Sequence, residues 1–160
     1  MSQNEGEWHY EQHVLGHNYR ITDMQCALGI SQLKRLDRFV VQRNRIAQRY
    51  REAFYSLPID LQQVDATEVS SYHLFTISLT ICNDETKKSF FEELKAKGIV
   101  CNCHYIPVHL QPFLKEKGFK EGNFPVAESY YQRSVSLPIY PDLSETDQNR
   151  VIEAVRCFFS

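Results

Sequence analysis

The stretch LFTISLTI (residues 74–81) alternates between apolar and hydroxyl-bearing side chains along its length. Phe75, Ile77, Leu79 and Ile81 fall on one side, and the threonines and the serine between them fall on the other. Successive side chains of a strand point to opposite faces, so this alternation predicts a strand that is buried on one face only. Its apolar face must then be covered by another layer of structure.

Helical patterns follow this strand at two places. Asn83 or Asp84 can cap a helix that ends at Gly98. The apolar stripe of that helix consists of Phe90, Phe91 and Leu94. Ser144, with Asp147 three residues further on, makes a near capping box at the start of a last helix. The buried stripe of this last helix is predicted to be Val151, Ile152, Val155, Phe158 and Phe159.

Shorter elements lie between these helices. Residues 99–105 are predicted to form a second strand, and residues 136–140 a short extended segment flanked by prolines. A short helix is predicted to end at Gly118, and another is predicted to run from Pro125 through Arg133. These elements would extend the sheet and add to its cover.

A long helical pattern precedes the sheet. Apolar residues recur at helical spacing from Met24 to Phe54, Thr22 or Asp23 can cap the start, and Pro58 ends the pattern. One helix over residues 22–57 would be about 50 Å long, at roughly 1.5 Å per residue. That exceeds the width of a small domain, so the helix either breaks or joins two bodies.

Together these elements predict an α+β fold in which a small, mostly antiparallel sheet carries helices on one face and follows a long helix. We divide the chain into an N-terminal segment (1–21), a long connecting helix (22–57) and a small α+β domain (58–160). The first segment is polar and aromatic.

Composition excludes several classes of protein. The 160 residues include 18 basic and 20 acidic side chains, so no concentrated basic surface for nucleic acid or an anionic membrane is expected. No apolar run has the length of a membrane span, and residues 1–7 lack the apolar core of a secretory signal. Five scattered cysteines favour reduced thiols, and we expect a cytoplasmic protein.

One ordered set of motifs resembles a known family. LGHNYRITD (15–23), followed by ALG (27–29), is similar to a segment of the DegT/DnrJ/EryC1/StrS sugar aminotransferases. Matches to the same family follow in order, namely QL (32–33), SYHLF (71–75), HYIP (104–107), HLQP (109–112), FPVAE (124–128) and LPIYP (137–141). WHYEQ (8–12) and HYIPVHLQPF (104–113) resemble the transaminases that make UDP-4-amino-4,6-dideoxy-N-acetyl-β-L-altrosamine for pseudaminic acid.

The resemblance implies a fold and a cofactor. Members of the family are fold-type-I enzymes, in which a large domain that binds pyridoxal phosphate (PLP) precedes a small C-terminal domain. This chain is similar to the C-terminal part. Residues 1–21 would then correspond to a segment of the large domain and the dimer interface. The amino donor in the family is glutamate.

The resemblance also implies binding residues. Asn18 would reach the PLP phosphate of a partner subunit, with Arg20 as a neighbouring charge, although an Asx-turn and a solvated arginine are the alternative. His104 and Tyr105 would lie near the nucleotide sugar, and Tyr10 is a further candidate, whereas surface or interface packing is the alternative for all three.

No catalytic residue is assigned. All eight lysines follow Asn18, whereas the family's cofactor lysine precedes the NYR motif, so we expect the isolated chain to be inactive. No metal site is predicted, because alternation turns Cys101 and Cys103 away from His104.

Two functions remain open at this stage. The chain can be the C-terminal part of an aminotransferase, either as one half of a split enzyme that works with a separate large-domain chain or as a truncated form of a longer protein. Alternatively, it is a non-enzymatic module that binds a UDP-sugar or a protein partner, or that self-associates without a ligand. In both cases we expect a homodimer or higher oligomer with an interface over residues 8–40. The apolar and aromatic side chains of this segment would otherwise form an exposed apolar patch.

Overall fold

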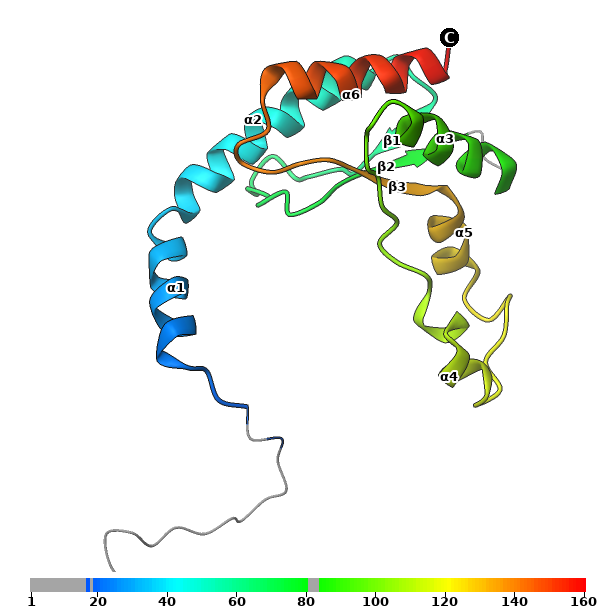
Figure 1. Ribbon diagram of the computed structural model, residues 1–160. Coiled ribbons are helices and arrows are strands. Elements are labelled where there is room, and N and C mark those ends of the chain that lie inside the picture. Colours follow the sequence, from blue (N-terminus) through cyan, green and yellow to red (C-terminus); the bar gives the residue numbers. More distant parts are fainter. Residues whose placement is uncertain (1–16, 18, 81–83) are drawn as a thin grey trace, which may run out of the picture. The chain divides into compact units, whose positions relative to one another are not determined.

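The computed structural model describes residue 17 and residues 19–80 and 84–160 (Figure 1). The chain divides into two compact units, residues 1–35 and residues 36–160. No helix within the described residues combines the length and the apolar character that a membrane span requires.

The larger unit is built on a three-stranded antiparallel sheet. Its strands are β1 (Ile59–Leu61), β2 (Phe75–Leu79) and β3 (Ser134–Leu137), with β2 in the middle. The alternating stretch around residue 77 therefore forms the central strand, as predicted. Ile77 lies opposite Leu61 on one neighbour and Val135 on the other, so apolar side chains face apolar side chains across the sheet.

Three helices cover the apolar face of this sheet. They are α2 (Leu36–Phe54), α3 (Asp84–Ala96) and α6 (Glu145–Phe158), and α6 contacts both of the others (Figure 1). Gln148 on α6 also donates to the backbone carbonyl of Ile46 on α2, at 2.8 Å. The largest side chains buried between these layers are Tyr50, Phe54, Ile77, Leu79, Phe90, Leu94, Val135 and Val155. The predicted α+β class with helices on one face is confirmed.

The predicted helix boundaries rest on local hydrogen bonds. Ser144 Oγ accepts from the backbone N–H of Asp147 at 3.0 Å, which caps α6 as expected. Gly98 follows α3 with a φ of +73°, a conformation that side chains with a Cβ rarely adopt. Helix α5 spans Pro125–Arg133, the range that the sequence predicted.

The prediction of a second strand over residues 99–105 is wrong, because this segment forms no regular strand. This segment makes one isolated antiparallel bridge, between Asn102 and Ser136. Asn102 Oδ1 accepts from the backbone N–H of Cys103 at 2.7 Å, and such a local bond competes with a regular ladder. The chain then forms the short helices η1 (Val108–Leu110) and α4 (Pro112–Lys115) before it reaches α5.

Residues 22–57, which carry one long helical pattern in the sequence, form two separate helices. In the smaller unit, α1 (Asp23–Leu33) begins with a complete capping box between Thr22 and Gln25. A turn at Lys34 and Arg35 follows, and α2 begins at Leu36. The division of the chain at residues 21 and 57 stays a prediction, whereas the boundary between the two compact units falls at residue 35.

Candidate functional site

The face of the sheet opposite the core carries hydroxyl groups. Thr76 and Ser136 lie opposite each other on β2 and β3, and their hydroxyl oxygens are 3.1 Å apart. His104, from the segment that follows α3, places Nδ1 2.8 Å from Ser136 Oγ. The hydroxyl of Ser136 therefore links Thr76 on the neighbouring strand to the imidazole of His104 and orients that ring.

Tyr105 extends this site toward solvent. The rings of His104 and Tyr105 meet edge to face, with 4.6 Å between their centroids, and a cis peptide bond joins the two residues. Tyr105 is 72% exposed, whereas His104 is half-buried. An exposed phenol beside an anchored imidazole can donate and accept hydrogen bonds toward a ligand.

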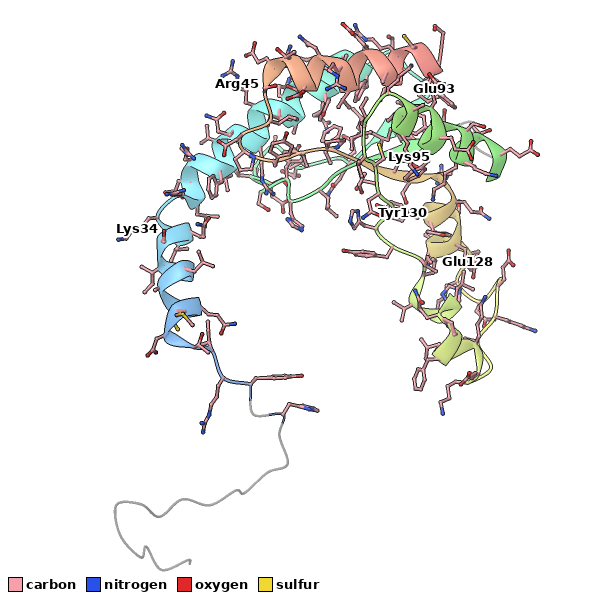
Figure 2. All side chains as sticks on the ribbon, viewed as in Figure 1. Lys34, Arg45, Glu93, Lys95, Glu128 and Tyr130 are labelled. Carbon is pink, nitrogen blue, oxygen red and sulfur yellow. The ribbon has the colours of Figure 1, made fainter. Side chains whose placement is uncertain are left out.

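A cavity of about 390 Å³ adjoins the same hydroxyl-bearing face. Thr76 belongs both to this cavity and to the His104 network. Tyr130 on α5, which is labelled in Figure 2, also lines the cavity. The other lining residues come from β1, β2 and the residue after β1, namely Asp60, Leu61, Gln62, Ile77 and Ser78.

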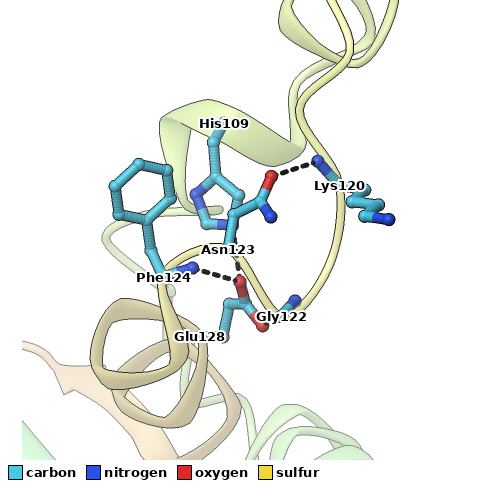
Figure 3. A network of polar contacts seen from close by, with 6 residues as sticks. All are labelled: His109, Lys120, Gly122, Asn123, Phe124 and Glu128. Atoms are coloured by element: carbon cyan, nitrogen blue, oxygen red, sulfur yellow. Dashed lines mark hydrogen bonds and ion pairs between the residues drawn. The ribbon is translucent and has the colours of Figure 1, made fainter.

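A second polar cluster lies between η1 and α5. Buried His109 places Nε2 2.7 Å from Glu128 Oε1 (Figure 3). The same carboxylate accepts the backbone N–H groups of Gly122, at 2.8 Å, and Phe124, at 3.0 Å. The ring of Phe124 packs against the ring of His109, with 4.7 Å between the centroids.

The electrostatics of this cluster identify it as a structural clamp. The backbone N–H groups of Gly122 and Phe124, and then the imidazole of His109, hold the pKa of Glu128 below its ordinary value. Gly122 has a φ of +87°, which lets its N–H point at the carboxylate. Glu128 is satisfied by these partners, so the cluster fastens the loop before α5 rather than offering free groups to a ligand.

The sequence-predicted site residues have different outcomes. Tyr10 and Asn18 lie outside the described residues. Arg20 is exposed in the smaller unit, and His104 and Tyr105 form one site in the larger unit. Sequence reasoning missed Thr76 and Ser136 as the partners of His104, although the alternating pattern already placed Thr76 on the polar face.

The cysteine and histidine pattern does not assemble a metal site in the described part of the chain, where no group of three potential ligands converges. Cys101 packs against the hydrophobic core, and burial raises the pKa of its thiol to about 12. Such a thiol resists the ionisation that zinc binding needs.

Comparison with known proteins shows the family. Residues 1–156 match the model of the DegT/DnrJ/EryC1/StrS aminotransferase family, and the chain belongs to that family. The chain is 39% identical to the spore coat polysaccharide biosynthesis protein SpsC of Bacillus subtilis, over 94% of this chain and 40% of that protein.

Solved structures agree with this assignment. The apo form of Spr1654 from Streptococcus pneumoniae, described as a sugar aminotransferase, matches with a TM-score of 0.89 at 27% identity, over 96% of this chain and 39% of that one. PseC of Helicobacter pylori, an aminotransferase of pseudaminic acid biosynthesis, matches with a TM-score of 0.84 at 26% identity, over 98% of this chain and 42% of that one. The chain thus spans about 40% of the length of these relatives.

Family members use PLP, since Spr1654 has been solved in PLP and PMP forms. The described residues of this chain do not by themselves fit that cofactor. Seven of the eight lysines are exposed, and the amine of Lys87 already donates to Tyr131 and Cys103. A Schiff-base lysine instead needs a free amine in a formed pocket.

Proposed function

We propose that this chain is the small domain of a PLP-dependent nucleotide-sugar aminotransferase and that the PLP lysine comes from a large domain. Amino transfer from glutamate to a UDP-4-keto-6-deoxy sugar is the reaction we assign to the combined protein. The family match over residues 1–156 carries this proposal. By itself the chain would be inactive, and we expect it in the cytoplasm.

The proposed role of the larger unit is to bind substrate. His104 is oriented by Ser136, and Tyr105 is exposed beside it, so both can hydrogen-bond a sugar or diphosphate oxygen. Tyr10 is a third candidate from the resemblance alone. The similarity to PseC supports a substrate of the pseudaminic acid type, which is the finer part of the proposal.

The proposed role of the smaller unit is to bind cofactor phosphate across a dimer interface. Asn18 would donate its amide to a phosphate oxygen, with Arg20 as a nearby positive charge. Exposed apolar side chains in this unit support an interface over residues 8–40, because such a set rarely faces water in a finished assembly. The exposed residues are Tyr19, Ile21, Met24, Leu28, Ile30 and Leu33.

A chimera tests the catalytic proposal. The part of SpsC that this chain does not match, about 60% of that protein, would be joined to residues 1–160 of this chain. We expect the purified chimera to bind PLP and to transfer an amino group from glutamate to a UDP-4-keto-6-deoxy sugar. A folded, PLP-loaded chimera that accepts glutamate but aminates no UDP-4-keto-6-deoxy sugar would contradict the proposed substrate.

Two histidine variants locate the substrate contact within the chimera. His104→Ala should raise the KM for the sugar about tenfold, the effect of losing one hydrogen bond of about 1.4 kcal/mol. The half-reaction with glutamate should be unchanged. His73→Ala is the matched control, since His73 is exposed and lies outside the site. Equal sugar KM values for the two variants would remove His104 from the proposed site.

The inactivity of the isolated chain has its own test. Treatment with PLP and borohydride should give no stoichiometric pyridoxyl adduct at a unique lysine, because seven of the lysines are exposed and the amine of Lys87 is already held by Tyr131 and Cys103. A single adduct of that kind, mapped by mass spectrometry, would overturn the proposal that the lysine comes from elsewhere.

The second candidate function is a non-enzymatic module that self-associates or binds a UDP-sugar. The exposed apolar set of the smaller unit favours it. Sedimentation of the isolated chain at micromolar concentration should show a dimer or larger species, and a monodisperse monomer would contradict the interface over residues 8–40. Saturable UDP-sugar binding that Tyr105→Ala abolishes would support the module.

A further inference from the structure

Three elements of the larger unit bring a lysine amine and a cysteine thiol together. Lys87 is on α3, Cys103 is in the loop segment that precedes His104, and Tyr131 is on α5. Lys87 Nζ lies 3.2 Å from Cys103 Sγ. Neither this pair nor its contacts belong to the proposed substrate site.

The surroundings hold the amine at the sulfur. Lys87 Nζ donates to the backbone carbonyl of Tyr131 and lies 4.3 Å from the centroid of the Tyr131 ring. Both contacts attract a cation and both restrict the long lysine side chain. The amine is therefore positioned before any reaction takes place.

Cys103 differs from the other described cysteines. Cys101 is packed against the core, and Cys157 is exposed at the end of α6. Cys103 is half-buried, and among the cysteines of residues 19–80 and 84–160 it alone has a lysine amine within hydrogen-bond distance. Oxidation-sensitive thiols in proteins are accessible and lie beside a cationic group.

We propose that Lys87 and Cys103 form an oxidant-dependent covalent cross-link between α3 and the segment that carries His104. The oxidant is hydrogen peroxide, and the product is a sulfenamide in which the lysine nitrogen is bonded to the cysteine sulfur. This inference does not rest on the proposed aminotransferase function.

The reaction balances in two steps. In the first, the Cys103 thiolate attacks one oxygen of peroxide, so that an S–O bond forms and the O–O bond breaks. The departing hydroxide takes a proton from the Lys87 ammonium and leaves as water, which gives a sulfenic acid beside a neutral amine. In the second, the amine attacks the sulfur, the S–O bond breaks, and hydroxide leaves as water with a proton from nitrogen. Sulfur is oxidised, peroxide is reduced, and the protein loses two hydrogen atoms.

The cross-link would act on the segment next to the proposed site. Cys103 is the residue before His104, so a covalent bond to α3 would fix the backbone from which that imidazole extends. A thiol reductant returns the thiol and the amine, because it attacks the sulfur and displaces the nitrogen. The bond would therefore be reversible.

Peptide mass spectrometry on the full 160-residue chain tests the proposal. After titration with hydrogen peroxide we expect a joined pair of peptides that contains Lys87 and Cys103 and lacks two hydrogen atoms. Trypsin should no longer cleave after Lys87, and dithiothreitol should restore both the cleavage and the separate peptides.

Matched lysine variants make the test specific. Lys87→Arg keeps the positive charge but removes the primary amine, so the joined pair should disappear while Cys103 oxidises to sulfenic or sulfinic acid. Lys88→Arg changes the neighbouring exposed lysine and should leave the cross-link intact. Far-UV circular dichroism checks that both variants fold.

Two results would overturn the proposal. One is a folded wild-type chain in which Cys103 stays reduced, or is oxidised while Lys87 keeps a free amine. The other is a joined pair that persists in Lys87→Arg at the level seen in Lys88→Arg.

Discussion

The two faces of the central strand β2 have different roles in the larger unit. On one face of β2, Phe75, Ile77 and Leu79 are buried beneath α2, α3 and α6. On the other face, Thr76 and Ser78 lie opposite the serines of β3 and line a cavity. The comparison shows that burial of apolar area holds the domain together, while the opposite face is free to carry polar contacts.

The largest expected effect tests the apolar face directly. Ile77→Ala removes a side chain that is 0% exposed and should lower the free energy of unfolding by about 2–5 kcal/mol. Thr76→Ala, one residue earlier on the opposite face, should cost about 1 kcal/mol. Urea unfolding followed by circular dichroism measures both. Equal losses for the two variants would contradict the division between faces.

A second, smaller effect concerns the polar face. Ser136→Ala removes the hydroxyl that contacts both Thr76 and His104, and should lower the free energy of unfolding by about 1–3 kcal/mol. Ser78→Ala on the same face is the control and should change stability by less than about 0.5 kcal/mol. A Ser136 variant as stable as the Ser78 variant would mean that His104 is held by other contacts.

A third effect comes from the helix layer. Ser144→Ala removes the side-chain cap of α6, so the free energy of unfolding should fall by about 1 kcal/mol. Ser56→Ala alters an exposed serine in the turn that follows α2 and should change little. If thermal unfolding gives the two variants the same midpoint, the Ser144 cap does not stabilise helix α6 on the sheet.

The smallest expected effect is a dependence of stability on pH. It comes from the contact between His109 and Glu128, because the described side chains on the apolar face of the sheet include no titratable group that could cause it. The pKa of Glu128 is lowered in the folded state, so its stabilising contribution is complete above its ordinary value of 4.5 and is lost as the pH falls through the lowered folded value. The difference in unfolding midpoint between wild type and Glu128→Gln should therefore shrink below pH 4.5. A difference that stays constant down to pH 3 would contradict the clamp.

Local patterns in the sequence predicted much of the fold. The alternation around Ile77, the proline at the start of α5 and the Ser144 cap each depend on residues within one element, so they can be recognised without the rest of the chain. Strand β1 has three residues, too few to show a period, and it escaped prediction.

The sequence by itself determined the class of the fold and the family, whereas the substrate-binding role of His104 and Tyr105 stays a prediction. Only the tertiary structure decided their partners, because Ser136 and Thr76 are 60 residues apart in the chain and meet through strand pairing. The same holds for Lys87 with Cys103 and for His109 with Glu128, each drawn from different elements. Periodicity specifies which face a side chain occupies, whereas packing between elements specifies what it meets there.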